Sequence, residues 1–466
     1  MEPSIDLPPA AATRTGAVME AIRRKVSTRA LAAGEKLPSI RALAKTLGVS
    51  PSTVVEAYDR LVAEGLIRSR PGSGFFVAGS LPLALAEVEP RADRAVDPLW
   101  VSRQSLDGAA DMLRPGCGWL PSDWMPNLAI RRAVRGLAKA SDGLLSDYGS
   151  TRGSLALRGL LARQFAAEGL DAGPEQILLT ASGTQAMDLV CRFLLQPGDT
   201  VLLDDPCYFN FQALLRVHRV NVVGVPRTPG GPDLASFAQA VAAHRPSLYL
   251  TNSAIHNPTG GSLSAQSAHR ILTLAAAHDM TIVEDDIFAD FEPEPSPRLA
   301  VLDGLARVIR VGSFSKTLSA SIRCGFIAAR ADWIDGLIDL QVATNFGGPN
   351  PIAAEIVSRT LADGSYRKHL ATLRSRLSKR RRETAATLEA LGIRPWLEPR
   401  GGFYLWCRLP DERDAAEVAR LALGERLVLA PGNVFSTGET ARDWMRFNVA
   451  QMGDPRLPAL LRQVLR

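Results

Sequence analysis

The chain has 466 residues, of which 46% are hydrophobic and 22% are charged. This composition is typical of a soluble globular protein, and the length indicates two or three domains. The N-terminus contains acidic residues and lacks the apolar stretch of a secretory signal, and no apolar run is long enough to span a bilayer. We therefore expect a cytoplasmic protein that is not bound to a membrane.

Cysteine usage and charge indicate the compartment of the protein and the kind of partner it binds. The five cysteines lie far apart and form no CxxC pair, which favours a reducing compartment and predicts neither a disulfide framework nor a metal site. The net charge is +6, and residues 1–80 contain 11 Lys and Arg against 7 Asp and Glu. This concentration of positive charge suggests an anionic partner for the N-terminal part, although a solvated surface explains it equally well.

Three helices are predicted near the N-terminus. Apolar residues recur every four positions over residues 14–29, which indicates an amphipathic helix. A second helix is expected to begin after Ser39 and end at Gly48, and a third to begin after Ser50 and end at Gly65. Two short helices joined by a glycine-containing turn predict a helix-turn-helix.

The stretch that follows, LIRSRPGSGFFV, predicts two short strands around a turn, as in a β-wing. In a winged helix the second helix of the motif enters the major groove by its N-terminal end, and the wing meets phosphates. Ser52, Thr53 and Glu56 would then face base edges, and a structural three-helix unit remains the alternative interpretation. The candidate DNA-contacting residues are Arg41, Ser50, Ser52, Thr53, Glu56, Arg70, Ser73 and Gly74.

The stretch LPSIRALAKTLGVSPSTVVEAYDRLVAEGLIRSRPGSGFFV resembles the GntR-type winged helix, including its LPS.R.LA opening and its G.G.FV wing. The resemblance implies a DNA-binding domain over residues 12–78 and double-stranded operator DNA as a partner. Many relatives carry an arginine or another polar residue where Pro51 and Val55 stand. Base recognition is therefore expected to depend on fewer polar side chains.

Residues 79–105 contain scattered prolines and alternating charges without a sustained period, which predicts a linker. Beyond it, short apolar runs such as QILLT, TVLLDD, SLYLTNS, TIVEDD and RVIRVGS alternate with helical segments. This alternation predicts an α/β domain with a mostly parallel sheet covered on both faces. Ligands of such sheets bind beyond the carboxyl ends of the strands.

Polar residues follow five of these predicted strands. Taken singly, each has an ordinary structural explanation, such as a capping turn or a core tyrosine. Pyridoxal phosphate (PLP), however, needs a lysine amine, a carboxylate for its pyridine nitrogen, donors for its phosphate and a ring to stack on. The strand ends supply that set in order: the turn ASGTQAMD, then Tyr208, Asn257, Asp285, and Lys316 with Ser313, Ser315 and Arg323.

Residues 110–466 resemble the aspartate aminotransferase family, fold type I of the PLP enzymes. The motifs YGSTRG, ASGTQAMDL, DDPCYFN, HNPTG, EDDIFADF, SFSKT......R.G, GGFYLW and RFNVA occur in the family's order. The resemblance implies a PLP-binding domain over residues 106–466, with a large part over about 145–345 and a smaller α+β C-terminal part over about 346–466.

The resemblance also implies a role for each matching residue. Lys316 would be the Schiff-base lysine, Asp285 the partner of the pyridine nitrogen, and Asn257 the partner of the phenolic oxygen, with Tyr208 stacked on the ring. Arg446 would bind the carboxylate of an amino acid, and Tyr148 would reach the phosphate in a neighbouring subunit, which implies a homodimer. The phosphate would be held by Ser182, Gly183, Thr184, Gln185, Ser313, Ser315 and Arg323.

One position departs from the family pattern. Members usually carry a tyrosine at or next to Phe288, where its hydroxyl bonds the phenolic oxygen of the cofactor. Phe288 cannot make that bond and leaves Asn257 as the main partner. We therefore expect bound PLP to exchange slowly with a substrate amine.

A GntR-type winged helix joined by a linker to an aminotransferase-like domain resembles the MocR subfamily of transcriptional regulators. The resemblance implies a DNA-binding regulator that senses an amino compound, or PLP itself, through Lys316. A functional aminotransferase with a regulatory winged helix is the alternative, so the chain's status as an enzyme stays open. A relic that binds neither DNA nor PLP is the third possibility.

Overall fold

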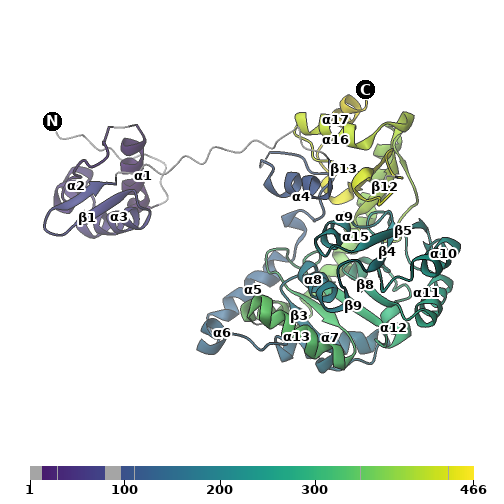
Figure 1. Cartoon of the computed structure of the whole chain (residues 1–466). Helices are drawn as coiled ribbons and strands as arrows, with labels where there is room; N and C mark the ends of the chain where they lie inside the picture. The colour runs from purple at the N-terminus through teal and green to yellow at the C-terminus, as the bar shows by residue number, and fades with distance from the viewer. Residues whose placement is uncertain (1–12, 29, 79–95, 110, 347, 439) are drawn as a thin grey trace. The chain divides into compact units, whose positions relative to one another are not determined.

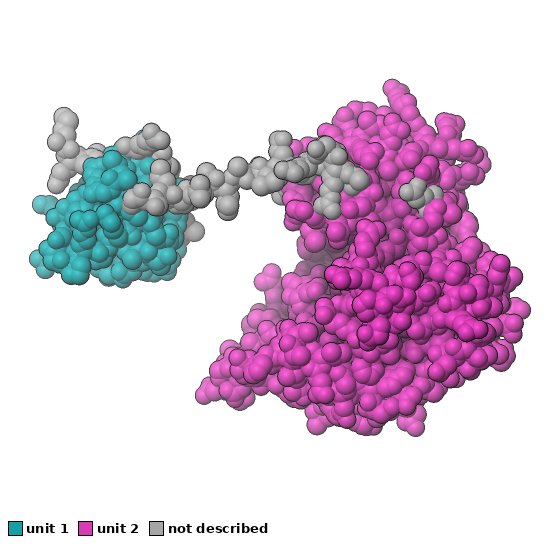
Figure 2. All heavy atoms as spheres, in the orientation of Figure 1, with its two compact units in different colours: residues 1–89 teal, residues 90–466 magenta. Residues whose placement is uncertain are grey.

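The computed structural model describes residues 13–28, 30–78, 96–109, 111–346, 348–438 and 440–466. Two units, residues 1–89 and 90–466, make up the chain and are coloured separately in Figure 2. Among the described residues, no helix is both long enough and apolar enough to cross a membrane.

The first unit is a three-helix domain with a two-stranded wing. Its elements are α1 (Arg14–Ser27), α2 (Ile40–Leu47), α3 (Pro51–Ala63), β1 (Ile67–Arg70) and β2 (Gly74–Val77) (Figure 1). The side chains of Ser39 and Ser50 accept hydrogen bonds from the backbone N–H groups of Ala42 and Thr53 at the starts of α2 and α3. Gly48 ends α2 in the left-handed conformation at φ 63°. The predicted starts of these two helices, and the predicted end of α2, are thus confirmed.

The wing is a short antiparallel hairpin. Strands β1 and β2 pair from Ile67 with Val77 to Arg70 with Gly74. The buried Tyr58 of α3 packs edge-on against Phe75 at 4.7 Å between ring centroids, and its hydroxyl donates to the Pro38 carbonyl at 2.8 Å. The hairpin is therefore anchored to the helices by an aromatic contact.

The second unit is built around an eight-stranded sheet with the order β3-β10-β9-β8-β7-β4-β5-β6. Neighbouring strands from β9 to β5 run parallel, whereas β10 is antiparallel to both of its neighbours and β6 is antiparallel to β5. The predicted α/β class and mostly parallel sheet are confirmed. The strands are β3 (Ile177–Thr180), β4 (Thr200–Asp205), β5 (Asn221–Thr228), β6 (Gly231–Pro232), β7 (Leu248–Thr251), β8 (Thr281–Asp285), β9 (Val308–Ser313) and β10 (Gly325–Ala328).

Helices cover both faces of this sheet. Adjacent residues of one strand enter different cores: Leu202 packs in one cluster, while Val201 and Leu203 pack in another. The first cluster includes side chains of α7 (Leu155–Ala167), α10 (Leu234–His244), α11 (Ala265–Ala277), α12 (Leu299–Asp303) and α14 (Pro351–Ala362). The second includes side chains of α8 (Gly183–Leu194), α9 (Phe209–Val217) and α13 (Ala331–Asn345). Helices α5 (Asn127–Leu137) and α6 (Asp142–Ser146) lie beside α14.

The smaller part contains an antiparallel sheet. Its strands, in the order β11-β12-β14-β13, are β11 (Arg394–Pro395), β12 (Tyr404–Arg408), β14 (Trp444–Asn448) and β13 (Ala430–Pro431). Helices α15 (Ser365–Glu389), α16 (Ala415–Gly424) and α17 (Leu457–Val464) pack in the same core.

The core of this smaller part also contains residues from the other end of the unit. Trp100, Val101, Leu120 and Trp124 belong to it. The backbone N–H of Leu113 donates to the Arg426 carbonyl at 3.0 Å, and the backbone N–H of Gly116 donates to the Val428 carbonyl at 2.9 Å. The segment before the large sheet therefore folds onto the C-terminal part.

The predicted linker over residues 79–105 ends in a helix. Residues 79–95 lie outside the described residues, and Pro98–Asp107 forms helix α4. Asp97 caps α4 by accepting from the N–H of Trp100, and Trp100 and Val101 are buried. The buried side includes the polar residues Gln104 and Ser105, which is why the sequence pattern does not reveal this helix.

Candidate cofactor and DNA-binding sites

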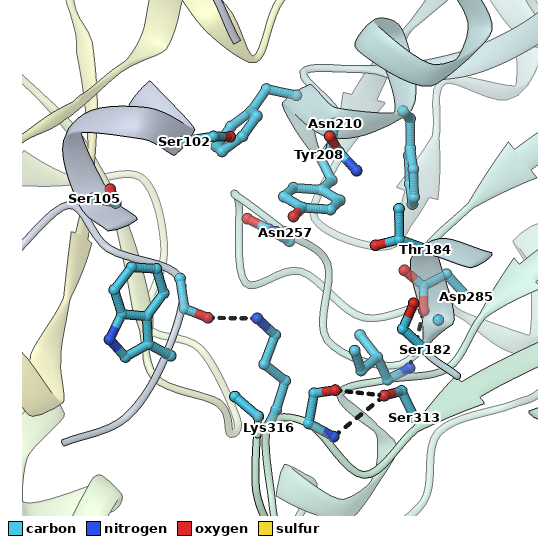
Figure 3. A pocket seen from close by; sticks show the side chains of 18 of the residues that line it. Ser102, Ser105, Ser182, Thr184, Tyr208, Asn210, Asn257, Asp285, Ser313 and Lys316 are labelled. Atoms are coloured by element: carbon cyan, nitrogen blue, oxygen red, sulfur yellow. Dashed lines mark hydrogen bonds between the residues drawn. The ribbon is translucent and has the colours of Figure 1, made fainter. Parts of the chain in front are cut away.

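A cavity of about 280 Å³ lies at the carboxyl ends of the parallel strands and is bordered by the smaller sheet. It brings together most of the sequence-predicted cofactor residues, several of which are labelled in Figure 3. Two predicted residues, Gln185 and Tyr148, do not line it. Those that do are Ser182, Gly183, Thr184, Tyr208, Asn257, Asp285, Ser313, Ser315, Lys316, Arg323 and Arg446.

One side of the cavity suits a phosphate. The first turn of α8 opens onto it, and a helix N-terminus presents free N–H groups and a positive dipole end. The hydroxyls of Ser313 and Ser315 lie 2.8 Å apart beside that turn, and Arg323 lines the same cavity. A Cβ at Gly325 would lie 2.8 Å from the Ser182 carbonyl carbon, so a side chain there would displace the turn.

Gln185 has a supporting position in this turn. Its side-chain oxygen accepts a hydrogen bond from the backbone N–H of Ala181 at 2.6 Å. The backbone N–H of Gln185 donates to the Ser182 hydroxyl at 3.0 Å. The Gln185 amide therefore holds the turn before α8 in shape from outside the cavity.

Lys316 is half-buried and lines the cavity. Its Nζ donates to the Gly118 carbonyl at 2.6 Å (Figure 3). Burial, and to a smaller degree the positive charge of Arg446, lowers the pKa of Lys316 to about 8. A larger fraction of this amine is therefore neutral, and so nucleophilic, near neutral pH than for an ordinary lysine.

Asp285 lines the same cavity at the end of β8. It accepts from the Ile287 N–H at 3.2 Å, and no ion pair to it occurs within the described residues. Burial raises the pKa of Asp285 to about 7. A protonated pyridine nitrogen would supply the cation that this carboxylate lacks, which fits PLP.

Arg446 lies on β14 with 1% of its surface exposed. Its Nη1 donates to Asn257 Oδ1 at 2.9 Å, its Nη2 donates to the Gly116 carbonyl at 2.8 Å, and its Nε has no partner in the described part of the chain. The guanidinium packs over the Tyr404 ring at 4.1 Å. A buried cation bonded only to neutral oxygens can accept a carboxylate ligand.

The loop that carries Asn257 is supported by a buried charged network. Asp204 pairs with Arg227 at 2.8 Å and lies 3.4 Å from His256 Nε2, while His256 Nδ1 lies 2.8 Å from the Thr259 hydroxyl. Burial lowers the pKa of His256 to about 4, so the ring is neutral at physiological pH. These contacts hold the residue next to Asn257 in place.

Several residues lining the cavity were not identified from the sequence. Phe288, which the sequence did single out, lines the cavity, and its ring packs edge-on against those of Phe403 and Tyr404 at 5.6 Å between centroids. The phenol of Tyr404, which was missed, lines the cavity beside it. Tyr404 was quoted only within the GGFYLW motif, without a role. Four residues of α4 were also missed: Val101, Ser102 and Ser105, whose segment was interpreted as a linker, and Leu106, the first residue of the predicted PLP-binding domain.

Tyr148 lies outside the cavity. It is 82% exposed, and its ring packs edge-on against the exposed Phe346 at 5.2 Å. Any contact of Tyr148 with a phosphate in the cavity would therefore have to involve another copy of the chain.

The candidate DNA-binding surface is open. Arg41, Ser52, Arg70, Ser73 and Gly74 are exposed, and Thr53 is half-buried. The Ser50 hydroxyl lies 2.8 Å from the hydroxyls of both Ser52 and Thr53. The hydroxyls of Ser52 and Thr53 therefore both already bond that of Ser50 at the helix cap.

Glu56, also predicted to face bases, pairs with Arg60 at 2.5 Å. Its second oxygen accepts from the Thr15 hydroxyl of α1 at 3.1 Å. Reading a base edge would require Glu56 to exchange one of these partners.

Comparisons with known proteins assign a family to each of the two parts of the chain. The family model for aminotransferase class I and II matches residues 122–464, and that for bacterial regulatory proteins of the gntR family matches residues 14–77. The HTH-type transcriptional regulator YdcR of Escherichia coli (strain K12) is 28% identical over 96% of this chain and 97% of its own length. YisV of Bacillus subtilis (strain 168), also named as an HTH-type transcriptional regulator, is 28% identical over 91% of this chain and 90% of its own.

Solved structures similar to the second unit are aminotransferases. The α-aminoadipate aminotransferase LysN of Thermus thermophilus, in complex with a phosphopyridoxyl-leucine compound, covers 80% of this chain and 95% of its own, with 25% identity and a TM-score of 0.72. The kynurenine aminotransferase of Pyrococcus horikoshii covers 77% and 92%, with 23% identity and a TM-score of 0.69. The chain therefore belongs to the aminotransferase class I and II family; its N-terminal domain matches the gntR family of bacterial regulatory proteins, and over nearly its whole length it is similar to proteins named as HTH-type transcriptional regulators.

Proposed function

We propose that this protein is a PLP-dependent, DNA-binding transcriptional regulator that senses an amino compound, or PLP itself, in its aminotransferase-like domain. The observation that carries the proposal is the charge pattern of one cavity. Lys316, Asp285 and Arg446 all line it, and the described residues supply no oppositely charged partner within ion-pair distance of any of them. Charges that are wholly or partly removed from water without a partner are costly, so this arrangement favours a ligand that pairs with all three.

PLP and an amino acid together match these needs. Lys316 would hold the aldehyde carbon, Asp285 the pyridine nitrogen and Arg446 the ligand carboxylate. Ser182, Gly183, Thr184, Ser313, Ser315 and Arg323 would bind the phosphate, with Tyr208 on the ring and Asn257 near the phenolic oxygen. When bound, PLP supplies an electrophilic carbon that captures amines reversibly. The residues of the cavity would orient the ligand, and the Gly118 carbonyl accepts a hydrogen bond from the Lys316 amine.

Sensing requires that the ligand favour one arrangement of the regulator over another, because a ligand with equal affinity for both arrangements shifts nothing. A homodimer would provide such arrangements. Exposed apolar side chains support it: Tyr148 contacts Phe346, and Tyr148 lines a surface pocket together with Leu155. We further propose that the protein is cytoplasmic, because a regulator that binds DNA must be in the same compartment as the DNA.

An aminotransferase acting on amino acids is the second candidate. The retained Lys316, Asp285 and Arg446 favour it, because all three would serve a transamination as well as a sensor. Phe288 opposes it, since a phenyl ring cannot donate a hydrogen bond to the cofactor.

Operator binding by the PLP-loaded full chain tests the proposal. The probe is double-stranded DNA that the protein itself selects from a randomised pool, and the readout is fluorescence anisotropy across a panel of amino acids. At least one amino acid is expected to change the dissociation constant of the wild type and to leave that of Lys316→Ala unchanged. Rapid multiple turnover with no effect on DNA binding would favour the aminotransferase. Identical responses of both proteins would contradict sensing through Lys316.

A further inference from the structure

Helix α4 forms one wall of the cofactor cavity. Its residues Val101, Ser102, Ser105 and Leu106 line the cavity, and Val101 is buried in the core of the smaller part. Figure 3 shows Ser102 and Ser105 on the opposite side of the cavity from Asp285 and Ser313. The wall formed by α4 is thus remote from the phosphate-binding side.

This wall carries no charge. Among the described residues that line the cavity, the charged side chains are Lys316, Arg323, Arg446 and Asp285. The proposed function uses all four, for the aldehyde, the phosphate, the ligand carboxylate and the pyridine nitrogen. The rest of the lining is uncharged and largely apolar, and on the side of α4 it includes Val101, Ser102, Ser105 and Leu106.

The geometry limits which ligands can bind. Figure 3 places Ser102 and Ser105 of α4 across the cavity from Ser313, so a ligand whose amine is at Lys316 would meet α4 with the atoms that extend away from the phosphate side. No charged side chain of α4 lines the cavity, so a second charge on those atoms would lose part of its hydration without gaining an ion-pair partner, whereas an apolar group would gain contacts.

We propose that the effector is an amine with a single carboxylate whose remaining atoms are uncharged and largely apolar, and that α4 is the wall that selects it. This inference rests on the proposed PLP-dependent sensing. Helix α4 begins at Pro98, close to the start of the described part of the second unit.

Two variants of α4 test the selection. Leu106 lines the cavity and is 70% exposed, whereas Leu99 on the same helix is 49% exposed and does not line it. Both positions accept an arginine without burying it, so both variants should fold. Leu106→Arg adds a cation at the cavity and Leu99→Arg is the matched control.

The measurement uses the PLP-loaded full chain, titrated with leucine, phenylalanine, glutamate and lysine, and followed by calorimetry and by the visible absorbance of the cofactor. The wild type is expected to bind leucine or phenylalanine at least about tenfold more tightly than glutamate or lysine. Leu106→Arg should raise the affinity for glutamate roughly two- to fivefold, as a largely exposed ion pair would. Leu99→Arg should leave the glutamate-to-leucine ratio unchanged.

Two results would overturn this inference. One is binding of glutamate or lysine to the wild type as tight as that of the best apolar amino acid. The other is an equal gain for glutamate in both variants, which would report overall charge and not the α4 wall. Failure of the proposed function looks different, because no cofactor absorbance would then develop, or no amino acid of the panel would bind.

Discussion

The candidate DNA-binding surface of the first unit and the cavity of the second differ in whether their polar groups have partners within the protein. On the surface, the hydroxyls of Ser52 and Thr53 both bond that of Ser50, and Glu56 pairs with Arg60. In the cavity, the half-buried Asp285 and the buried Arg446 have no charged partner among the described residues. The polar groups of the surface therefore satisfy one another, whereas the cavity leaves charges unpaired, and those charges indicate the chemistry of the proposed ligand.

Replacing Lys316 is the strongest way to test this contrast. Lys316→Ala should abolish the visible absorbance of bound PLP and the borohydride-reducible bond to the protein, because no other amine is held in the cavity among the residues that line it. Absorbance and mass spectrometry measure the loss. The control is Lys379→Ala, whose side chain is 75% exposed on α15. A reducible adduct that persists at another lysine would refute the assignment.

Asp285→Asn tests whether the Asp285 carboxylate pairs with the pyridine nitrogen of the cofactor. The affinity for PLP should fall about a hundredfold, because the pyridine nitrogen loses a half-buried ionic partner. Fluorescence titration measures it, and an unchanged affinity would remove Asp285 from the site.

The same variant has a stability effect in the cofactor-free protein. Burial raises the pKa of Asp285 to about 7, above the value of about 4 for an unfolded aspartate. Between these values the folded state holds a proton that the unfolded state has released, so stability falls as the pH rises from about 4 to about 7. Asp285→Asn should remove this component of the pH dependence, as measured by denaturant unfolding.

The pH dependence of PLP capture tests the environment of Lys316. Only the neutral amine attacks the aldehyde, and the pKa of Lys316 is about 8. The capture rate of the cofactor-free protein should fall about tenfold per pH unit below that value and level off above it. Stopped-flow absorbance measures the rate. With Nα-acetyl-lysine as the control, the rate should keep rising to about pH 10; the same profile for the protein would contradict the lowered pKa of Lys316.

Arg41→Ala addresses the exposed surface, where a smaller effect is expected. If Arg41 contacts a phosphate, the slope of log affinity against log salt should decrease by about 0.9, and binding should weaken for all sequences alike. Arg41→Lys keeps the charge and should keep the slope. An unchanged slope in Arg41→Ala would remove Arg41 from the interface.

Much of the fold and the site could be predicted from the sequence, because the signals are local. The helix starts after Ser39 and Ser50 depend on a side chain that bonds a backbone group three residues away. The parallel strands follow from apolar runs of adequate length, and the carboxyl ends of such strands meet at one edge. For this reason Asn257, Asp285 and Lys316 could be expected to lie together.

Only the tertiary structure decided the roles that depend on distant pairs. Arg446 donates to the carbonyl of Gly116, 330 residues earlier in the chain, and Lys316 donates to Gly118, 198 residues earlier. Helix α4 carries buried polar residues, so its packing has no periodic apolar signature in the sequence. The sequence by itself determined the caps, the strands and the chemistry available at their ends, since those depend on neighbours along the chain. Which side chains close the cavity, and which charges stay without partners in it, depends on contacts that exist only after folding.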